Sequence, residues 1–271
     1  MWKNTEKKPI GLFLLLTFFI AWACEAILIV LERLNFLSGT IGFIFIFAVI
    51  GFGAGFAPAY ATYIILRKYK KIENIKSFAA FLFKGSFTLK AIVITLLFFA
   101  GQFVLTAVTN SYTGQAGYMF ILYIPLMVIG GGMEEIGWRG FFQPALEEKF
   151  PFPLAAFIVG LAWAVWHLPL WFIEGASQSS TNFISFLCYC IVFSFVLGML
   201  YKLTKNTLMC ILLHAWGNVL GTMFIGDAVY NYPNSYLLII YAAEIVVSIV
   251  VVMIVDKKRN AKSDLLTTEN Q

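Results

Sequence analysis

Residues 235–255 read SYLLIIYAAEIVVSIVVVMIV, an apolar run whose single charged residue is Glu244. A helix needs about 20 mainly apolar residues to cross the hydrocarbon core of a bilayer. This run is long enough, and its composition predicts a transmembrane helix.

The rest of the chain repeats this pattern, and its composition excludes a soluble domain. Of the 271 residues, 61% are apolar and 12% are charged, and the mean hydropathy is +0.85. Further runs long enough to span a membrane lie at 10–31, 40–66, 91–109, 118–138, 154–173, 183–203 and 206–224. The sequence therefore predicts an all-α fold, a polytopic transmembrane bundle of about eight helices.

The distribution of Lys and Arg predicts the orientation of the bundle, because cytoplasmic loops carry an excess of these residues. With the N-terminus inside, 18 of the 19 basic residues fall on the cytoplasmic side, and Arg33 alone falls outside. An even number of spans follows, with both termini in the cytoplasm. This asymmetry accounts for the net charge of +5, so we expect no nucleic-acid partner.

The chain reads as a single membrane domain over 1–255, with a motif-bearing core at about 118–224. Residues 256–271 form a polar cytoplasmic tail, which we expect to be disordered. The lysines before Ile10 resemble the start of a signal peptide, but the apolar run continues to Leu31 and favours a retained helix.

A cluster of ionisable side chains lies in the run at 118–138, where residues 130–139 read GGGMEEIGWR. Charges at the bilayer centre cost about 2.5 to 3.5 kcal/mol each on insertion scales, so they usually mark function. Glu135 and Arg139 are four residues apart and share a helix face, where they can form an ion pair. Glu134 points about 100° away and is free to act as a general base. An ion-pair cluster without a catalytic role is the alternative for this segment alone.

His167 and His214 are the only histidines in the chain, and both lie in apolar runs. Trp163 precedes His167 by four residues, so its indole can pack against the imidazole and hold it in one orientation. His214 and Asn218 also share a helix face, and two adjacent donors suit the stabilisation of an oxyanion. Each pair alone could instead be a polar contact between helices. The coincidence of all these pairs favours a catalytic site.

These motifs, Glu-Glu-x-x-x-Arg at 134–139, aromatic-x-x-x-His at 163–167 and His-x-x-x-Asn at 214–218, resemble those of the CPBP family of intramembrane proteases. The family includes type II CAAX prenyl endopeptidases and Abi-type bacterial proteins of bacteriocin processing or self-immunity. The chain departs from the family at Trp163, where phenylalanine is usual. An aromatic ring is kept, while the shape of the pocket is left open.

The resemblance implies an intramembrane endopeptidase that hydrolyses a peptide bond near the cytoplasmic face. Glu134 would activate a water, His167 would position or polarise it, and His214 with Asn218 would form the oxyanion hole. Three residues would support the site: Glu135, Arg139 and Trp163. The expected location agrees with the topology, since Glu134 precedes Arg139, taken to lie at the inner surface, by about 7.5 Å of helix rise.

The substrate implied is a hydrophobic or lipidated peptide in the lipid bilayer. The lysine-rich composition fits a multi-pass protein of a bacterial plasma membrane. A non-catalytic immunity or interaction protein is the alternative function. A proton-coupled transporter is less favoured, because the sequence has no repeat symmetry of the kind that transporters show.

Two mechanisms stay open at this stage. Glu134, His167 and His214 together offer one carboxylate and two imidazoles, a ligand set that catalytic zinc uses. The same glutamate can instead act as a metal-free base, and no His-Glu-x-x-His helix is present. Zinc is therefore an open cofactor, and we lean to the metal-free mechanism.

The two histidines differ in depth if their helices start level. His167 lies 13 residues into the run that begins at 154, and His214 lies eight into the run that begins at 206. The difference is about 7.5 Å of helix rise. Pro151 and Pro153 indicate that the helix starts at the membrane interface, so that the span itself begins later, near Phe157, although a tilted helix would also bring the histidines together.

Overall fold

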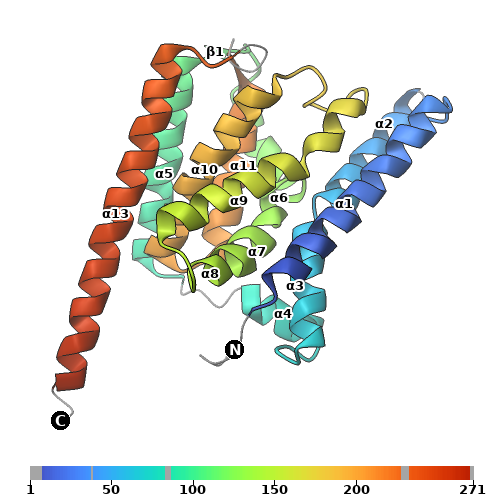
Figure 1. The fold of residues 1–271 in the computed structure, drawn as a ribbon. Helices are drawn as coiled ribbons and strands as arrows, with labels where there is room; N and C mark the ends of the chain where they lie inside the picture. The colour runs from blue at the N-terminus through green and yellow to red at the C-terminus, as the bar shows by residue number, and fades with distance from the viewer. Residues whose placement is uncertain (1–7, 38, 83–86, 227–231, 269–271) are drawn as a thin grey trace.

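The computed structural model of the chain describes residues 8–37, 39–82, 87–226 and 232–268. Helices make up nearly all of the regular structure in these ranges (Figure 1). Two short strands, β1 (Ser111–Tyr112) and β2 (Phe224–Ile225), pair antiparallel at one end of the bundle. The predicted all-α membrane bundle is confirmed.

Seven helical stretches in the described residues are long and apolar enough to cross a membrane. They comprise α1 (Ile10–Arg33), α2 (Gly39–Ala48) with a π segment (Val49–Ala54) and α3 (Ala57–Lys68), α5 (Leu89–Thr109), α6 (Met119–Ile129) with α7 (Glu135–Gly137) and α8 (Gln143–Leu146), α9 (Phe152–Trp166) with a 3-10 turn (Leu168–Phe172), α10 (Phe183–Thr204) and α13 (Ser235–Thr268). A further apolar helix, α11 (Thr207–Met223), has 17 residues and is about 25 Å long. Together they match the eight spans expected.

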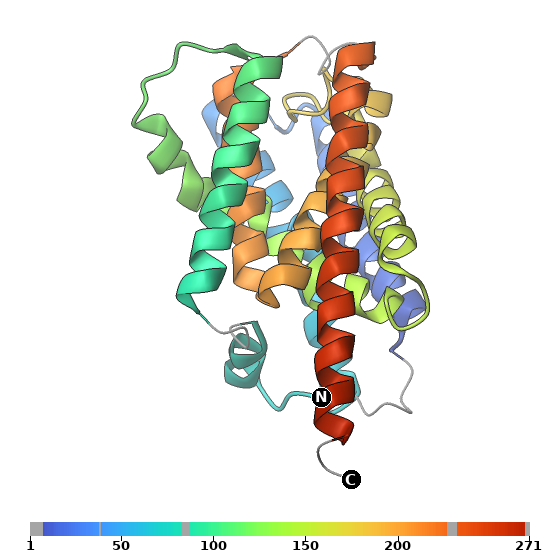
Figure 2. The ribbon, with the colours of Figure 1, turned by 90° about the vertical axis from the view of Figure 1, so that its left-hand side faces the viewer.

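The start of α1 and the end of α13 lie at the same end of the bundle, as an even number of spans requires (Figures 1 and 2). The short helix α4 (Ile75–Leu82) lies at this end too, separate from α5. We call it the basic end, because it carries Lys8, Lys68, Lys149 and Lys205. The opposite end is the strand end, since it carries β1 and β2.

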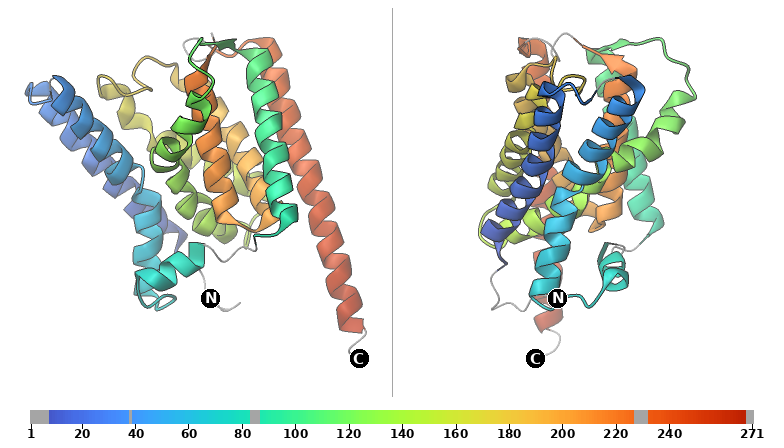
Figure 3. Two further views of the ribbon diagram at one scale, coloured as in Figure 1. Left: turned by 180° about the vertical axis from the view of Figure 1, so that it is seen from behind. Right: turned by 90° about the vertical axis from the view of Figure 1, so that its right-hand side faces the viewer.

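Helices α1 and α2 lie side by side at one edge of the molecule, and they meet the remaining helices towards the basic end (Figures 1 and 3). Phe13 of α1 packs its ring against Trp138, Phe141 and Phe142, with ring centroids 5.2 to 5.7 Å apart. Gly137 allows α3 to approach, because a Cβ there would lie 2.4 Å from Cβ of Pro58. The N-terminal spans therefore support the motif-bearing core directly.

Helix α9 begins at Phe152. The start of the membrane span near Phe157 stays a prediction. Pro151 precedes the helix and Pro153 lies in its first turn, where proline is tolerated because that turn needs no amide donor. Figure 1 shows α9 lying obliquely in the bundle. A tilted helix is the second way in which the two histidines can come together, and this tilt brings the C-terminal end of α9 towards α11.

Helix α13 continues through Thr268, so the residues expected to form an irregular tail are helical up to that point. Residues 269–271 lie outside the described part of the chain. Two contacts fix the start of this segment: Asp256 forms an ion pair of 2.8 Å with Lys202, and Arg259 donates to the Lys202 carbonyl. Tertiary contacts of this kind are not visible in the local composition.

Gly160 sets the distance between α9 and α10, because a Cβ there would lie 2.6 Å from Cα of Ile191. We expect Gly160→Ala to destabilise the bundle by about 1 to 3 kcal/mol, since a clash with backbone cannot relax easily. Gly101→Ala is the matched control, because open space surrounds the corresponding position on α5. Thermal unfolding in detergent measures both, and equal midpoints would contradict the packing described here.

Candidate active site

The segment that carries Glu134 and Glu135 is not one continuous helix. Helix α6 ends at Ile129, and a 3-10 turn (Gly132–Glu134), the single turn of α7 and a π segment (Trp138–Phe142) follow. The predicted continuous helix over 118–138 is therefore wrong.

The side chain of Arg139 is fully buried inside the protein. Its Nη1 lies 3.0 Å from Oε1 and 2.9 Å from Oε2 of Glu135, which is also fully buried. The predicted i,i+4 ion pair is thus present. Arg139 also donates from Nη2 to the Ser194 carbonyl, which ties the pair to α10.

His214 completes this buried network. Its Nδ1 lies 2.8 Å from Oε1 of Glu135, the same oxygen that Arg139 contacts. A carboxylate can only accept hydrogen bonds, so Nδ1 of His214 is the donor. The second ring nitrogen, Nε2, is left facing away from Glu135. Glu135 therefore fixes the ring orientation of a histidine that is 79 residues away in the sequence.

Glu134 is 4% exposed and is held by Trp163 rather than by the ion pair. The indole Nε1 donates to Oε2 of Glu134 at 2.6 Å. A phenylalanine, the residue usual in the resembling family, has no such donor. The departure at Trp163 thus gives the carboxylate a fixed orientation.

His167 follows the last residue of α9, and its Nδ1 lies 2.8 Å from the Trp163 carbonyl. Because a carbonyl only accepts, Nδ1 is protonated, and Nε2 of a neutral ring carries a lone pair. The Trp163 ring centroid is 5.7 Å from that of His167 and 5.1 Å from that of His214. The predicted packing of Trp163 on His167 is present, and both histidines converge on the indole.

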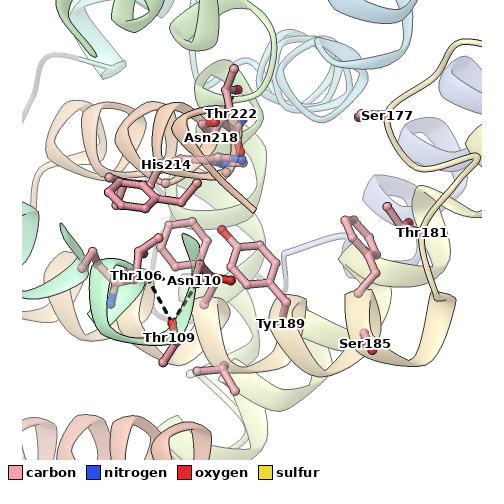
Figure 4. Close-up of a pocket in the computed structure, with 18 of the residues that line it drawn as sticks. Thr106, Thr109, Asn110, Ser177, Thr181, Ser185, Tyr189, His214, Asn218 and Thr222 are labelled. Atoms are coloured by element: carbon pink, nitrogen blue, oxygen red, sulfur yellow. Dashed lines mark hydrogen bonds between the residues drawn. The ribbon is translucent and has the colours of Figure 1, made fainter. Parts of the chain in front are cut away.

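Gly131 leaves room beside His214 and Asn218. A Cβ at this position would lie 2.3 Å from Nδ2 of Asn218 and 3.2 Å from Nε2 of His214. The two nitrogen atoms therefore point to the same space over the Gly131 backbone. In Figure 4, His214 and Asn218 lie next to each other on α11, with Thr222 beyond them.

The possible zinc ligands do not form a metal site in this arrangement. Within the described ranges, no three His, Cys, Asp or Glu side chains are grouped so as to hold a metal ion. The indole of Trp163 contacts both imidazoles, and its Nε1 binds one oxygen of Glu134. Glu134, His167 and His214 are thus brought to one place but are not arranged as metal ligands.

Glu134, His167, His214 and Asn218 open into a cavity of about 580 Å³. The cavity extends towards the strand end, where Asn110, Ser177 and Thr181 line it (Figure 4). His214 is the eighth of the 17 residues of α11, so the site lies near the middle of the bundle. The predicted location near the cytoplasmic face of the membrane stays a prediction.

Sequence reasoning missed the polar residues of this wall, because single Ser, Thr and Asn residues near helix ends carry no periodic signal. Glu244 of α13 also lines the cavity. It accepts a hydrogen bond of 2.7 Å from Gln102, which joins α13 to α5 beside the cavity.

Two comparisons bear on this site. Residues 115–220 match the family model described as Type II CAAX prenyl endopeptidase Rce1-like. A curated protein of Methanococcus maripaludis, CAAX prenyl protease 2, is 27% identical over 135 residues, which cover 45% of this chain and 50% of that protein. The chain thus matches about half the length of this relative. All four residues that line the inner end of the cavity fall within the range of the family model.

Removing one partner of the buried ion pair should be costly. Arg139→Met leaves Glu135 buried with less compensating charge, and we expect a loss of about 3 to 5 kcal/mol of stability. Lys149→Met, at an exposed position, is the control and should change little. Unfolding in detergent measures both. A stable Arg139→Met protein would show that the ion pair does not hold the site together.

Proposed function

The chain belongs to the CPBP family of CAAX-type intramembrane proteases, and we propose that it is an endopeptidase whose Glu134 activates a water for attack on a peptide bond. The observation that carries this proposal is the setting of the Glu134 carboxylate. It is buried, it lines the cavity, and Trp163 holds its Oε2. Its Oε1 is then placed to take the proton of a water.

His167 positions the same water. Its Nδ1 donates to the Trp163 carbonyl, so the lone pair of Nε2 can accept the second hydrogen of a water bound to Glu134. General-base catalysis by a positioned side chain contributes about 10² to 10⁴ in rate. Trp163 contacts both residues and sets their relative position.

His214 and Asn218 serve as the oxyanion hole. Nδ1 of His214 already donates to Glu135, so Nε2 can donate to an oxyanion only if the ring is an imidazolium. The charges then balance, since two carboxylates, Glu134 and Glu135, face two cations, Arg139 and His214. Balanced charge lowers the cost of burying the group in the membrane.

The reaction follows from these positions. The water oxygen bonds to the substrate carbonyl carbon as its proton moves to Glu134, and the carbonyl oxygen becomes an oxyanion that His214 and Asn218 stabilise. The carbon–nitrogen bond then breaks, and the proton passes from Glu134 to the leaving amine. The products are a new carboxyl terminus and a new amino terminus.

The metal-free mechanism is favoured because the zinc ligand set does not form here. The proposed substrate is a hydrophobic or lipid-associated peptide held in the bilayer, and the proposed location is a bacterial plasma membrane. Family membership and the lysine-rich composition support both proposals.

The base is tested by Glu134→Gln, which keeps the size of the side chain but cannot take a proton. We expect cleavage of a lipid-associated reporter peptide library by the purified protein to fall by at least about 10²-fold. A zinc chelator should leave the wild-type rate unchanged. Full loss of activity with chelator, restored by added zinc, would contradict the metal-free mechanism.

The oxyanion hole is tested at Gly131, where an added methyl group would occupy the space in front of Asn218. We expect Gly131→Ala to lower kcat by about 10²- to 10³-fold, the cost of losing one oxyanion donor. Gly11→Ala on α1 is the control, because open space surrounds that position and Gly11 does not line the cavity. If the two variants cleave the reporter equally fast, Asn218 is not the donor.

A further inference from the structure

The cavity reaches only one end of the bundle in the described part of the chain. Where it is lined by α5, α9, α10, α11 and α13, the lining residues lie in the half of each helix nearer the strand end, except His214, which lies at the middle of α11. On α11 they run from His214 to Thr222, and on α10 from Ser185 to Phe193. Figure 4 shows Thr222, Thr181 and Ser185 on the walls of this space.

Side-chain exposure changes along the cavity. Glu134 and His214 at its inner end are 4% and 2% exposed, whereas Ser177 and Ser180 at its rim are exposed. On the other side of the catalytic residues, towards the basic end, a layer of side chains is fully buried: Trp138, Arg139, Phe142 and Gln143. The catalytic residues are therefore closed off from the basic end and open to the strand end.

The charge distribution indicates which side of the membrane each end of the bundle faces. The loops at the basic end contain nearly all of the Lys and Arg residues, while segments 110–118 and 173–182 at the strand end contain none. Lys and Arg mark the cytoplasmic side, so the strand end faces the opposite side. The open end of the cavity is thus extracytoplasmic.

The chemistry of the wall indicates what kind of peptide fits. Near the rim the wall offers neutral hydroxyl and amide groups, such as Asn110, Ser177, Thr181 and Asn182. Apart from the catalytic Glu134, the acidic residue in the cavity wall is Glu244, and the lining residues include neither Lys nor Arg. Such a wall can hydrogen-bond an extended backbone and accepts neutral or basic side chains.

We propose that the protease takes its substrate from the extracytoplasmic half of the membrane, as an extended peptide segment with neutral or basic side chains. This inference rests on the proposed function and specifies its substrate. It disfavours a lipidated carboxyl terminus presented in the cytoplasm, because the buried layer at the basic end separates that side from Glu134.

Single cysteines test the direction of access in the full chain, expressed in cells with its four native cysteines changed to alanine. Thr222→Cys lies in the cavity wall one turn beyond Asn218, and Ser177→Cys lies at the rim. Lys149→Cys lies exposed at the basic end and is the matched control. A membrane-impermeant cationic thiosulfonate reagent is added to intact cells and then to permeabilised cells.

We expect the reagent to modify Thr222→Cys and Ser177→Cys in intact cells, and Lys149→Cys only after permeabilisation. Modification of Thr222→Cys should also block cleavage of the reporter by the protein purified afterwards. Modification of Thr222→Cys and Ser177→Cys only after permeabilisation would overturn the proposal, as would modification of Lys149→Cys in intact cells.

The two proposals fail separately, because labelling does not depend on catalysis. Absence of Glu134-dependent cleavage in detergent would refute the protease function while leaving the assigned opening intact. If cleavage in detergent is normal but the cysteines are labelled only from the cytoplasm, the protease function stands, and the proposed extracytoplasmic entry of the substrate is refuted.

Discussion

The carboxylate of Glu135 is the contact on which the site depends, because it binds Arg139 and His214 at once in a fully buried position. Three spans meet there: the irregular fourth span, α11 through His214, and α10 through the hydrogen bond from Arg139 to Ser194. A charge left unpaired at this depth would be costly, so the network has one arrangement of low energy. That arrangement leaves Nε2 of His214 pointing towards Asn218 and the space over Gly131.

The two adjacent glutamates, Glu134 and Glu135, have separate partners. In a regular α-helix, Glu134 and Glu135 would differ by one fixed rotation of about 100°. Glu135 accordingly lies in the ion pair and Glu134 against Trp163, at the inner end of the cavity. Glu135 thus organises the site, and Glu134 is free to act as the proposed general base.

The sequence predicts what depends on composition or on short spacing. The spans follow from apolar length, the Glu135–Arg139 pair from a separation of four residues, and the approach of Trp163 to His167 from the same spacing. What it misses depends on tertiary contacts. The helical continuation beyond Asp256 and the closure of the basic end by Trp138 and Phe142 each arise from contacts between residues distant in sequence. The hydrogen bond from Trp163 to Glu134, across 29 residues, has no signal in spacing at all.

Direct attack by an activated water is the central claim, and single-turnover cleavage of a reporter peptide in ¹⁸O-labelled water with added hydroxylamine tests it. We expect one ¹⁸O atom in the new carboxyl terminus and no hydroxamate, because water, not a side chain, attacks the carbonyl carbon. A hydroxamate product, or an acylated protein seen by mass spectrometry, would show a covalent intermediate and contradict the role given to Glu134.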